Sequence, residues 1–318
     1  MKSAEDALFG PAVVPFGNIG GNGRYRMPLL PGEPGVATGG DWVPHGVMRA
    51  TRLASAIEDT KSLNEWEQRH MMRGLVLDVS LYEELGILVR DGMRAGVDWD
   101  DLPEKHPDIR DAMTGKPNDS KSADASIAGR AKHMAGGNVA RQKGTNRHAV
   151  WDARAEHGQW IGSDDINAQL TAVEGLLDKA GFERVPGLHE RVIRNMAVDC
   201  AGRFDDVLIS RRTGKLFIAD LKTKRKPFKS WLTVDAQLAI YARAEHMLEQ
   251  DSYVPGPLSN VDQERGIVLV CPSDGSDPYL RPADLVTGWR TALLAREVVD
   301  LRAYARSVAR GNMTVGEW

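Results

Sequence analysis

The sequence predicts an α/β domain with a mostly helical N-terminal region, and two observations lead to this prediction. Apolar residues between positions 47 and 95 recur at three- and four-residue spacing, which is typical of amphipathic helices. From Leu188 onward the period changes, and three runs of β-branched or apolar residues follow one another with turn residues between them. The expected order is helices, three strands, helix, strand and helix, which suits a mixed sheet flanked by helices.

Three regions are expected along the chain. Residues 1–45 are crowded with Gly and Pro and are predicted to form an extended arm, ordered only where it docks on something. Residues 46–135 form the helical region, with a polar, proline-broken loop over 97–125, and helix resumes beyond Gly137. Residues 136–318 form the core. Its expected elements are a helix capped by Ser163 and ended by Gly181, strands over 188–196, 201–210 and 215–222, a helix over 233–250, a strand over 265–273 and a long helix from Pro282.

The composition excludes several classes of protein. Hydrophobic residues make up 42% of the 318 residues and charged residues 27%, as in an ordinary globular protein. Cys200 and Cys271 are far apart and form no CxxC pair, which argues against a disulfide framework, a structural zinc site or a four-thiolate iron–sulfur cluster within this chain. The N-terminus has no apolar signal region, and no apolar run approaches the roughly 20 residues of a membrane span. We therefore expect a cytoplasmic protein in a bacterial or phage-infected cell, with no membrane partner.

The distribution of charge is more informative than its sum. The net charge of −3 gives no general case for nucleic-acid binding. Between Gly202 and Lys229, however, nine basic residues surround three acids. Cations for a phosphate backbone and carboxylates for a metal are what a metal-dependent phosphodiesterase needs. A solvated strand edge protected by lysines is the alternative interpretation of the charge alone.

Asp220 and Lys222 stand two apart at the end of an apolar strand, so their side chains share one face. On its own this spacing is more typical of a salt bridge at a strand end. Asp205 lies on the preceding strand, and a hairpin at Arg211–Gly214 can bring it beside Asp220. Two neighbouring carboxylates repel one another unless a cation lies between them. A hard, oxygen-rich site of this kind suits Mg²⁺ or Mn²⁺.

Four motifs occur in one order along the chain. Gly144–His148 supplies G-x-x-x-H, Gly202–Asp205 reads GRFD, Ile218–Thr223 reads IADLKT, and Gln237–Tyr241 supplies Q-x-x-x-Y. Together they resemble the signature of RecB-type exonucleases in the PD-(D/E)XK nuclease superfamily, over roughly residues 140–250. The resemblance implies a PD-(D/E)XK restriction-endonuclease-like core and metal-dependent hydrolysis of DNA phosphodiesters.

The resemblance also implies individual roles. His148, Asp205 and Asp220 would be metal ligands, together with the carbonyl of Leu221. Lys222 would be the catalytic lysine beside Asp205 and Asp220, and Gln237 and Tyr241 would contact DNA or brace the site. Glu190 matches a further acid found in some relatives. We also expect Arg203, Lys224 and Arg225 to contact DNA, the last two because they directly follow the catalytic strand.

The chain departs from the superfamily pattern in two ways. It has Asp220 where the superfamily name has Glu, and it lacks the cysteine cluster of the iron–sulfur members. It therefore resembles the cluster-free, phage-type recombination exonucleases, which act in DNA recombination or repair and commonly work with a single-strand annealing protein. Trp231, close to Lys229, fits base stacking in single-stranded DNA, and it fits core packing at least as well.

Two alternatives remain open. The Gly/Pro arm suits a non-catalytic or dual-role nuclease-fold component of a nucleoprotein or viral assembly, because such arms often become ordered by wrapping a partner. A site-specific endonuclease would share the chemistry of the exonuclease.

Overall fold

A computed structural model describes residues 24, 25, 27, 47–57, 61–94, 127–136, 139–223, 231–249, 252–255 and 260–309. The chain divides into two compact units, Met1–Glu58 with Arg147–Trp318, and Asp59–Asn146. The first unit holds the sheet and the second is helical. The sequence-based division assigns residues 46–135 to one helical region, whereas β1 and α2, between residues 48 and 54, pack against the sheet. The predicted loop over 97–125 lies outside the described residues.

The helical unit contains α3 (Lys61–Leu77), α4 (Val79–Arg94) and α7 (Ile127–Met134). The first two confirm the helices predicted between residues 47 and 95. A small apolar core joins all three helices, and it consists of Leu75, Leu81, Ile127 and Ala131. No described helix of the chain combines the length and the hydropathy needed to cross a membrane.

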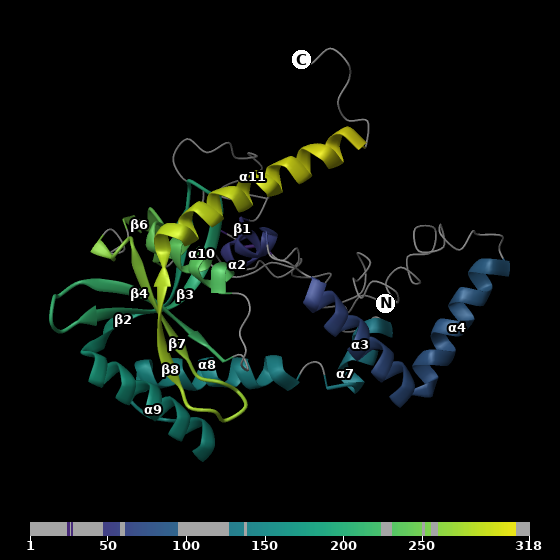
Figure 1. Ribbon diagram of the computed structural model, residues 1–318, viewed down its shortest axis with the longest axis horizontal. Helices are drawn as coiled ribbons and strands as arrows, with labels where there is room; N and C mark the ends of the chain where they lie inside the picture. The colour runs from purple at the N-terminus through teal and green to yellow at the C-terminus, as the bar shows by residue number, and fades with distance from the viewer. Residues whose placement is uncertain are drawn as a thin grey trace, which may run out of the picture. The chain divides into compact units, whose positions relative to one another are not determined.

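The other unit is built on one mixed sheet (Figure 1). Its strands are β1 (Met48–Arg49), β2 (Phe182–Asn195), β3 (Cys200–Ser210), β4 (Leu216–Lys222), β5 (His246–Glu249), β6 (Ser252–Pro255), β7 (Arg265–Val270) and β8 (Tyr279–Asp284). Their order is β6-β5-β2-β3-β4-β7-β8, with β1 paired to β3. The β1–β3 and β4–β7 pairs are parallel, and the remaining pairs are antiparallel.

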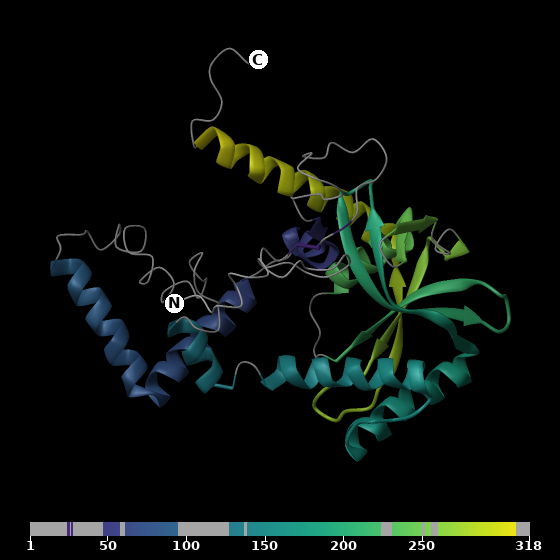
Figure 2. The same ribbon diagram turned by 180° about the vertical axis from the view of Figure 1, so that it is seen from behind.

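Helices cover both faces of this sheet, as Figures 1 and 2 show. They are α2 (Ala50–Ala54), the 3₁₀ turn η1 (Ser55–Ile57), the part of α8 (Val139–His157) from Arg147 onward, α9 (Asp164–Ala180), α10 (Trp231–Ala242) and α11 (Leu285–Ala309). Alternate strand residues point to opposite faces. In β4, Ile218 packs in the core with α2, α10 and α11, whereas Ala219 and Leu221 pack with α8 and α9. The predicted α/β architecture, a mixed sheet between helical layers, is confirmed.

Two predicted helix boundaries are wrong. The helix expected over 233–250 ends at Ala242, and His246–Glu249 instead forms β5. Met247 pairs with Ile193 of β2 and is buried, so sheet pairing prevails over the helical spacing of this segment. The long C-terminal helix begins at Leu285 rather than at Pro282, which lies in β8.

Capping residues explain where two of these helices begin or end. The Asp284 carboxylate accepts hydrogen bonds from the amides of Val286 and Thr287, which satisfies the first turn of α11. Gly181 ends α9 in the left-handed region (φ 77°), as predicted. Ser163 precedes α9 as predicted, but its hydroxyl bonds the Asp165 side chain instead of a backbone amide.

Part of the predicted arm docks on the sheet. Tyr25 exchanges two backbone hydrogen bonds with Val47, at 2.9 and 2.8 Å. Tyr25 and Met27 are buried in a cluster with Val192 of β2 and Ala201 of β3. These described residues therefore follow the expectation that the arm is ordered where it packs; the rest of 1–45 lies outside the described residues.

Candidate active site

The β3–β4 hairpin sets the position of the two central carboxylates. Asp206 pairs with Ala219 across this antiparallel ladder, so the next positions, Asp205 and Asp220, lie opposite one another. The turn between the strands falls at Arg211–Gly214, as predicted. Asp205 is 8% exposed and Asp220 is 2% exposed. The sequence-based expectation that the hairpin brings Asp205 beside Asp220 is confirmed.

His148 and Leu221 gather around Asp205. The Nδ1 atom of His148, on α8, lies 3.4 Å from Oδ2 of Asp205. The Leu221 amide donates a 2.7 Å hydrogen bond to the same oxygen, and the His148 imidazole also hydrogen-bonds the Leu221 backbone. Three of the predicted metal-site residues therefore share one cluster.

Lys222, Gln237 and Tyr241 gather around Asp220. The Lys222 ammonium lies 2.6 Å from Oδ2 of Asp220 and donates to Oε1 of Gln237 at 3.4 Å. The Gln237 amide donates to Asp220 Oδ1 at 3.4 Å and to the Tyr241 hydroxyl at 2.8 Å. Gln237 and Tyr241 lie one turn apart on α10, as their spacing in the sequence predicts.

Burial and charge shift the protonation of this site. Burial, followed by repulsion from Asp220, raises the pKa of Asp205 well above its usual range. Burial lowers the pKa of His148, which keeps the imidazole neutral and able to act as a ligand. Burial opposes the charge of Lys222, but attraction to Asp220 and Asp205 prevails and raises its pKa, so it stays protonated. The site therefore holds a neutral base, a cation and two crowded carboxylates.

The donor set fits a hard divalent cation in its chemistry. Two carboxylates, a neutral imidazole and a backbone carbonyl are ligands that Mg²⁺ or Mn²⁺ accepts. Burial and repulsion from Asp220 disfavour the ionised form of Asp205, and a bound cation would stabilise that form. Within the described ranges, however, no group of three or more His, Cys, Asp or Glu side chains stands close enough to hold a metal. The Asp220 carboxylate is directed instead to Lys222 and Gln237.

A buried clamp that the sequence analysis missed joins α8 to the sheet. Asp206 accepts a 2.6 Å hydrogen bond from the Trp151 indole and a 2.8 Å bond from Arg184 of β2. The Arg184 guanidinium also lies over the Trp151 ring, 4.4 Å from its centroid. Trp151 follows His148 by three residues, and Asp206 follows Asp205, so the clamp fixes the distance between His148 and Asp205. The sequence feature that could have indicated this clamp is the adjacent pair Asp205 and Asp206 inside an otherwise apolar strand.

Two further acids lie beside the clamp. Glu190 has a positive φ of 50°, just after an irregularity in the β2–β3 pairing, and burial raises the pKa of its side chain. It forms a 3.4 Å ion pair with Arg203, one of the residues predicted to contact DNA. Burial, with repulsion from Glu190 and Asp206, raises the pKa of Asp152 to about 7.

Asp152→Asn is expected to stabilise the protein above neutral pH. An unfolded aspartate titrates near 3.9, whereas folded Asp152 titrates at about 7. Between these values the folded state binds the extra proton, so stability falls as pH rises. Asparagine mimics the protonated form and removes that loss. Thermal unfolding at pH 8 and pH 4 should show a higher Tm for the variant only at pH 8, whereas Glu156→Gln, an exposed carboxylate of the same helix, should show no such difference.

Gly202→Ala is expected to disturb the site through Tyr241. A Cβ at position 202 would lie 2.4 Å from the Tyr241 ring and 3.1 Å from the Ala50 side chain of α2, so the ring would have to move. Overpacking of this kind costs about 1–3 kcal/mol. Urea unfolding should show this loss, and Gly202→Ala/Tyr241→Phe, which leaves the ring in place, should recover none of it. A Gly202→Ala protein as stable as the parent would contradict the close contact.

Several predicted contacts have other outcomes. Lys224 and Arg225 lie outside the described residues. Trp231 is partly buried, and the Arg281 guanidinium lies 4.3 Å from its ring centroid. Since one face of this ring is covered by Arg281, core packing describes Trp231 better than an open stacking surface.

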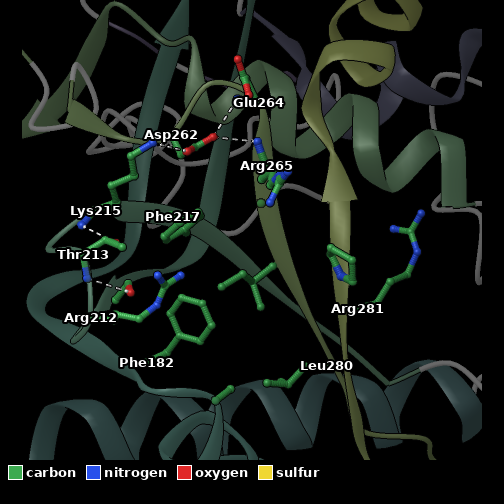
Figure 3. Close-up of a pocket in the computed structure, with 15 residues that line it drawn as sticks. Phe182, Arg212, Thr213, Lys215, Phe217, Asp262, Glu264, Arg265, Leu280 and Arg281 are labelled. Carbon is green, nitrogen blue, oxygen red and sulfur yellow. Dashed lines mark hydrogen bonds and ion pairs between the residues drawn. The ribbon is translucent and has the colours of Figure 1, made fainter.

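A separate pocket of about 580 Å³ lies at the other end of β4 (Figure 3). Phe182 and Phe217 meet edge to face in it, with ring centroids 5.5 Å apart. Arg212 and Arg265 line it, and neither guanidinium makes a hydrogen bond or ion pair to another described residue, although the Arg265 backbone amide donates to the Asp262 carboxylate. This pocket is distinct from the carboxylate site. Its lining residues do not include His148, Asp205, Asp220 or Lys222.

Comparison with known proteins adds little. No protein-family model matches the chain, and no curated protein matches it. Twelve chains of solved structures match. One of them, described as "Crystal structure of SSO0001", is 18% identical, with 50% of this chain and 72% of that chain covered and a TM-score of 0.23. A TM-score this low supports no statement about the fold or the function of this chain.

Proposed function

We propose that this chain is a divalent-metal-dependent deoxyribonuclease, a RecB-type exonuclease with a PD-(D/E)XK core. The observation that carries the proposal is the pair of buried carboxylates on neighbouring strands, Asp205 and Asp220, with Lys222 2.6 Å from one and His148 3.4 Å from the other. A buried pair of like charges is costly unless it serves a cation. The run of basic residues that begins at Lys222 and continues to Lys229 in the sequence makes a phosphodiester the natural substrate.

Each residue has a role in the proposed hydrolysis. A Mg²⁺ or Mn²⁺ ion bound by His148, Asp205, Asp220 and the Leu221 carbonyl would polarise the phosphodiester and make a water molecule more nucleophilic. Lys222 stays protonated and stabilises the negative charge that develops on the phosphate oxygens. Water adds to phosphorus and releases a proton to solvent, the bond between phosphorus and the leaving oxygen breaks, and that oxygen takes up a proton from solvent.

Gln237 and Tyr241 support this arrangement from α10. The Gln237 amide bridges Asp220, Lys222 and the Tyr241 hydroxyl. Burial raises the pKa of Tyr241 well above its usual range, so the hydroxyl stays protonated. Both residues are in place to hold the Lys222 ammonium toward a bound phosphate.

An assay with purified full-length protein tests the proposal. Linear single- and double-stranded DNA should be degraded in Mg²⁺ or Mn²⁺ and left intact in a chelator. Covalently closed circular DNA should resist, because an exonuclease needs an end. Cleavage of the circle would indicate an endonuclease, and no metal-dependent cleavage of any substrate would overturn the proposal.

A second candidate is a nuclease-fold component of a nucleoprotein or viral assembly that binds DNA without cutting it. The observation that favours it is the lack, among the described residues, of three ligand side chains already arranged around a metal position. The mass of the particle in solution, measured with and without DNA, separates the two. A large homo-oligomer that binds but does not cut DNA would favour this second candidate.

A further inference from the structure

Five arginines line a hollow of about 440 Å³ on the sheet unit, away from the carboxylates. We call it the arginine groove and define it by these five residues, which are Arg24, Arg52, Arg296, Arg302 and Arg306. One comes from the N-terminal arm, one from α2 and three from α11. Cations from three separate segments converge here, which distinguishes the groove from the solvated face of a single helix.

The packing of α11 against α2 and η1 shapes the groove. Arg296, Val299, Ala303 and Arg306 recur at three- and four-residue spacing, so they share the face of α11 that lines it. The Arg302 guanidinium donates a 3.2 Å hydrogen bond to the carbonyl of Ala56 in η1 and ties the two walls together. Figure 1 shows α11 passing beside α2.

The positive charge of the groove is only partly balanced. Asp199, the one acid of its described lining, is already paired with Arg194 at 2.6 Å. Arg296 is paired with Asp300 on its own helix. The guanidinium groups of Arg52 and Arg306 make no hydrogen bond or ion pair to any other described residue, although the Arg52 carbonyl accepts a bond from the Ser55 hydroxyl. Like charges at close range repel one another, so an anion that enters the groove would stabilise it.

The chemistry of the groove suits phosphates. A guanidinium group presents a planar fork of donors that matches two phosphate oxygens at once. The remaining described lining is small or aliphatic and contains no aromatic ring to stack on a base. Such a surface recognises a repeated phosphate backbone and carries no base readout.

The groove lies within reach of the carboxylate site. Asp199 precedes Asp205 by six residues, and at about 3.3 Å per residue of strand the two are at most about 20 Å apart. That span equals roughly six base pairs of duplex DNA. The groove wall α2 also touches the site, because Ala50 packs beside Gly202, whose neighbour is the Tyr241 ring.

We propose that the arginine groove is a second DNA-binding site, which holds the phosphate backbone of the substrate within about six base pairs of the carboxylates. That the DNA bound in the groove is the substrate of the carboxylate site rests on the proposed nuclease function. Contact with phosphates there would fix a long substrate while its end occupies the carboxylate site. A small phosphodiester cannot span the two sites and gains nothing from the groove.

DNA binding in a chelator tests the proposal without cleavage. The variant is Arg52→Gln/Arg306→Gln in the full chain, and the probe is a 30-base-pair duplex. The matched control, Arg212→Gln/Arg265→Gln, removes the same charge from the pocket of Figure 3. Each lost phosphate contact lowers the slope of log Kd against log salt by about 0.9, so the groove variant should lose between one and two units of slope and bind about tenfold more weakly. The control should bind like the parent.

Kinetics provide the second measurement. The groove variant should show a raised KM on the long duplex, with its rate on bis(p-nitrophenyl) phosphate unchanged. Equal loss of DNA binding in both double variants would mean a general charge effect and would overturn the proposal, as would parental binding by the groove variant. A protein that binds DNA through the groove but never cuts it would contradict the nuclease function and leave the groove standing.

Discussion

Asp205→Asn is expected to abolish metal-dependent cleavage without loosening the fold. Under the proposed function this carboxylate is a ligand on which both metal binding and charge stabilisation depend, so its removal should lower cleavage by at least about 10³-fold. In a chelator the variant should be as stable as the parent or more stable. The reason is that buried, crowded Asp205 disfavours its own ionised form, and Asn can still accept the Leu221 hydrogen bond.

The sign of the pH effect distinguishes this explanation from a simple loss of structure. The pKa of folded Asp205 lies well above its unfolded value, so the metal-free parent loses stability as pH rises from about 4 through the folded pKa. The variant should lack this loss, and adding Mn²⁺ should raise the Tm of the parent alone. Thermal unfolding at several pH values with and without Mn²⁺ measures both effects. A variant that still cuts DNA, or that gains the same Tm from Mn²⁺, would show that Asp205 is no ligand.

Lys222→Gln is expected to cost both stability and activity. The Asp220 side chain is 3% exposed and would lose the ammonium group 2.6 Å away, which leaves a buried charge without its partner. Breaking a buried pair from one side costs about 3–5 kcal/mol. Loss of a donor that stabilises developing charge lowers the rate by about 10²–10³-fold. Urea unfolding and single-turnover cleavage measure the two effects.

Lys215→Gln is the matched control for this prediction. Its ammonium is 65% exposed and lies 3.4 Å from Asp262, and surface pairs of this kind contribute under about 1 kcal/mol. The control should therefore unfold almost like the parent and cut DNA at the parental rate. If Lys222→Gln proved as harmless as this control, the ion pair with Asp220 would not hold the site together.

Site residues could be predicted from the sequence where the geometry of a single strand, hairpin or helix determines their positions. Asp220 and Lys222 share a face because strand side chains alternate, and a short hairpin leaves few registers for Asp205. Gln237 and Tyr241 follow from helical spacing. The predicted end of α10 and the predicted start of α11 were wrong. Met247 and Pro282 lie in strands that pair with other strands of the sheet, and the helical spacing of their neighbours in the sequence does not show this pairing.

The sequence alone determined the strands β2, β3, β4 and β7 and the carboxylates at Asp205 and Asp220, because both depend on residues close together in the chain. Only the tertiary structure decided the Trp151–Asp206 clamp, the direction of Asp220 toward Lys222 and the arginine groove. These depend on contacts between segments far apart in sequence, such as Arg302 with Ala56. Such contacts form only when the sheet and its helices pack together, so the spacing of residues along the chain does not predict them.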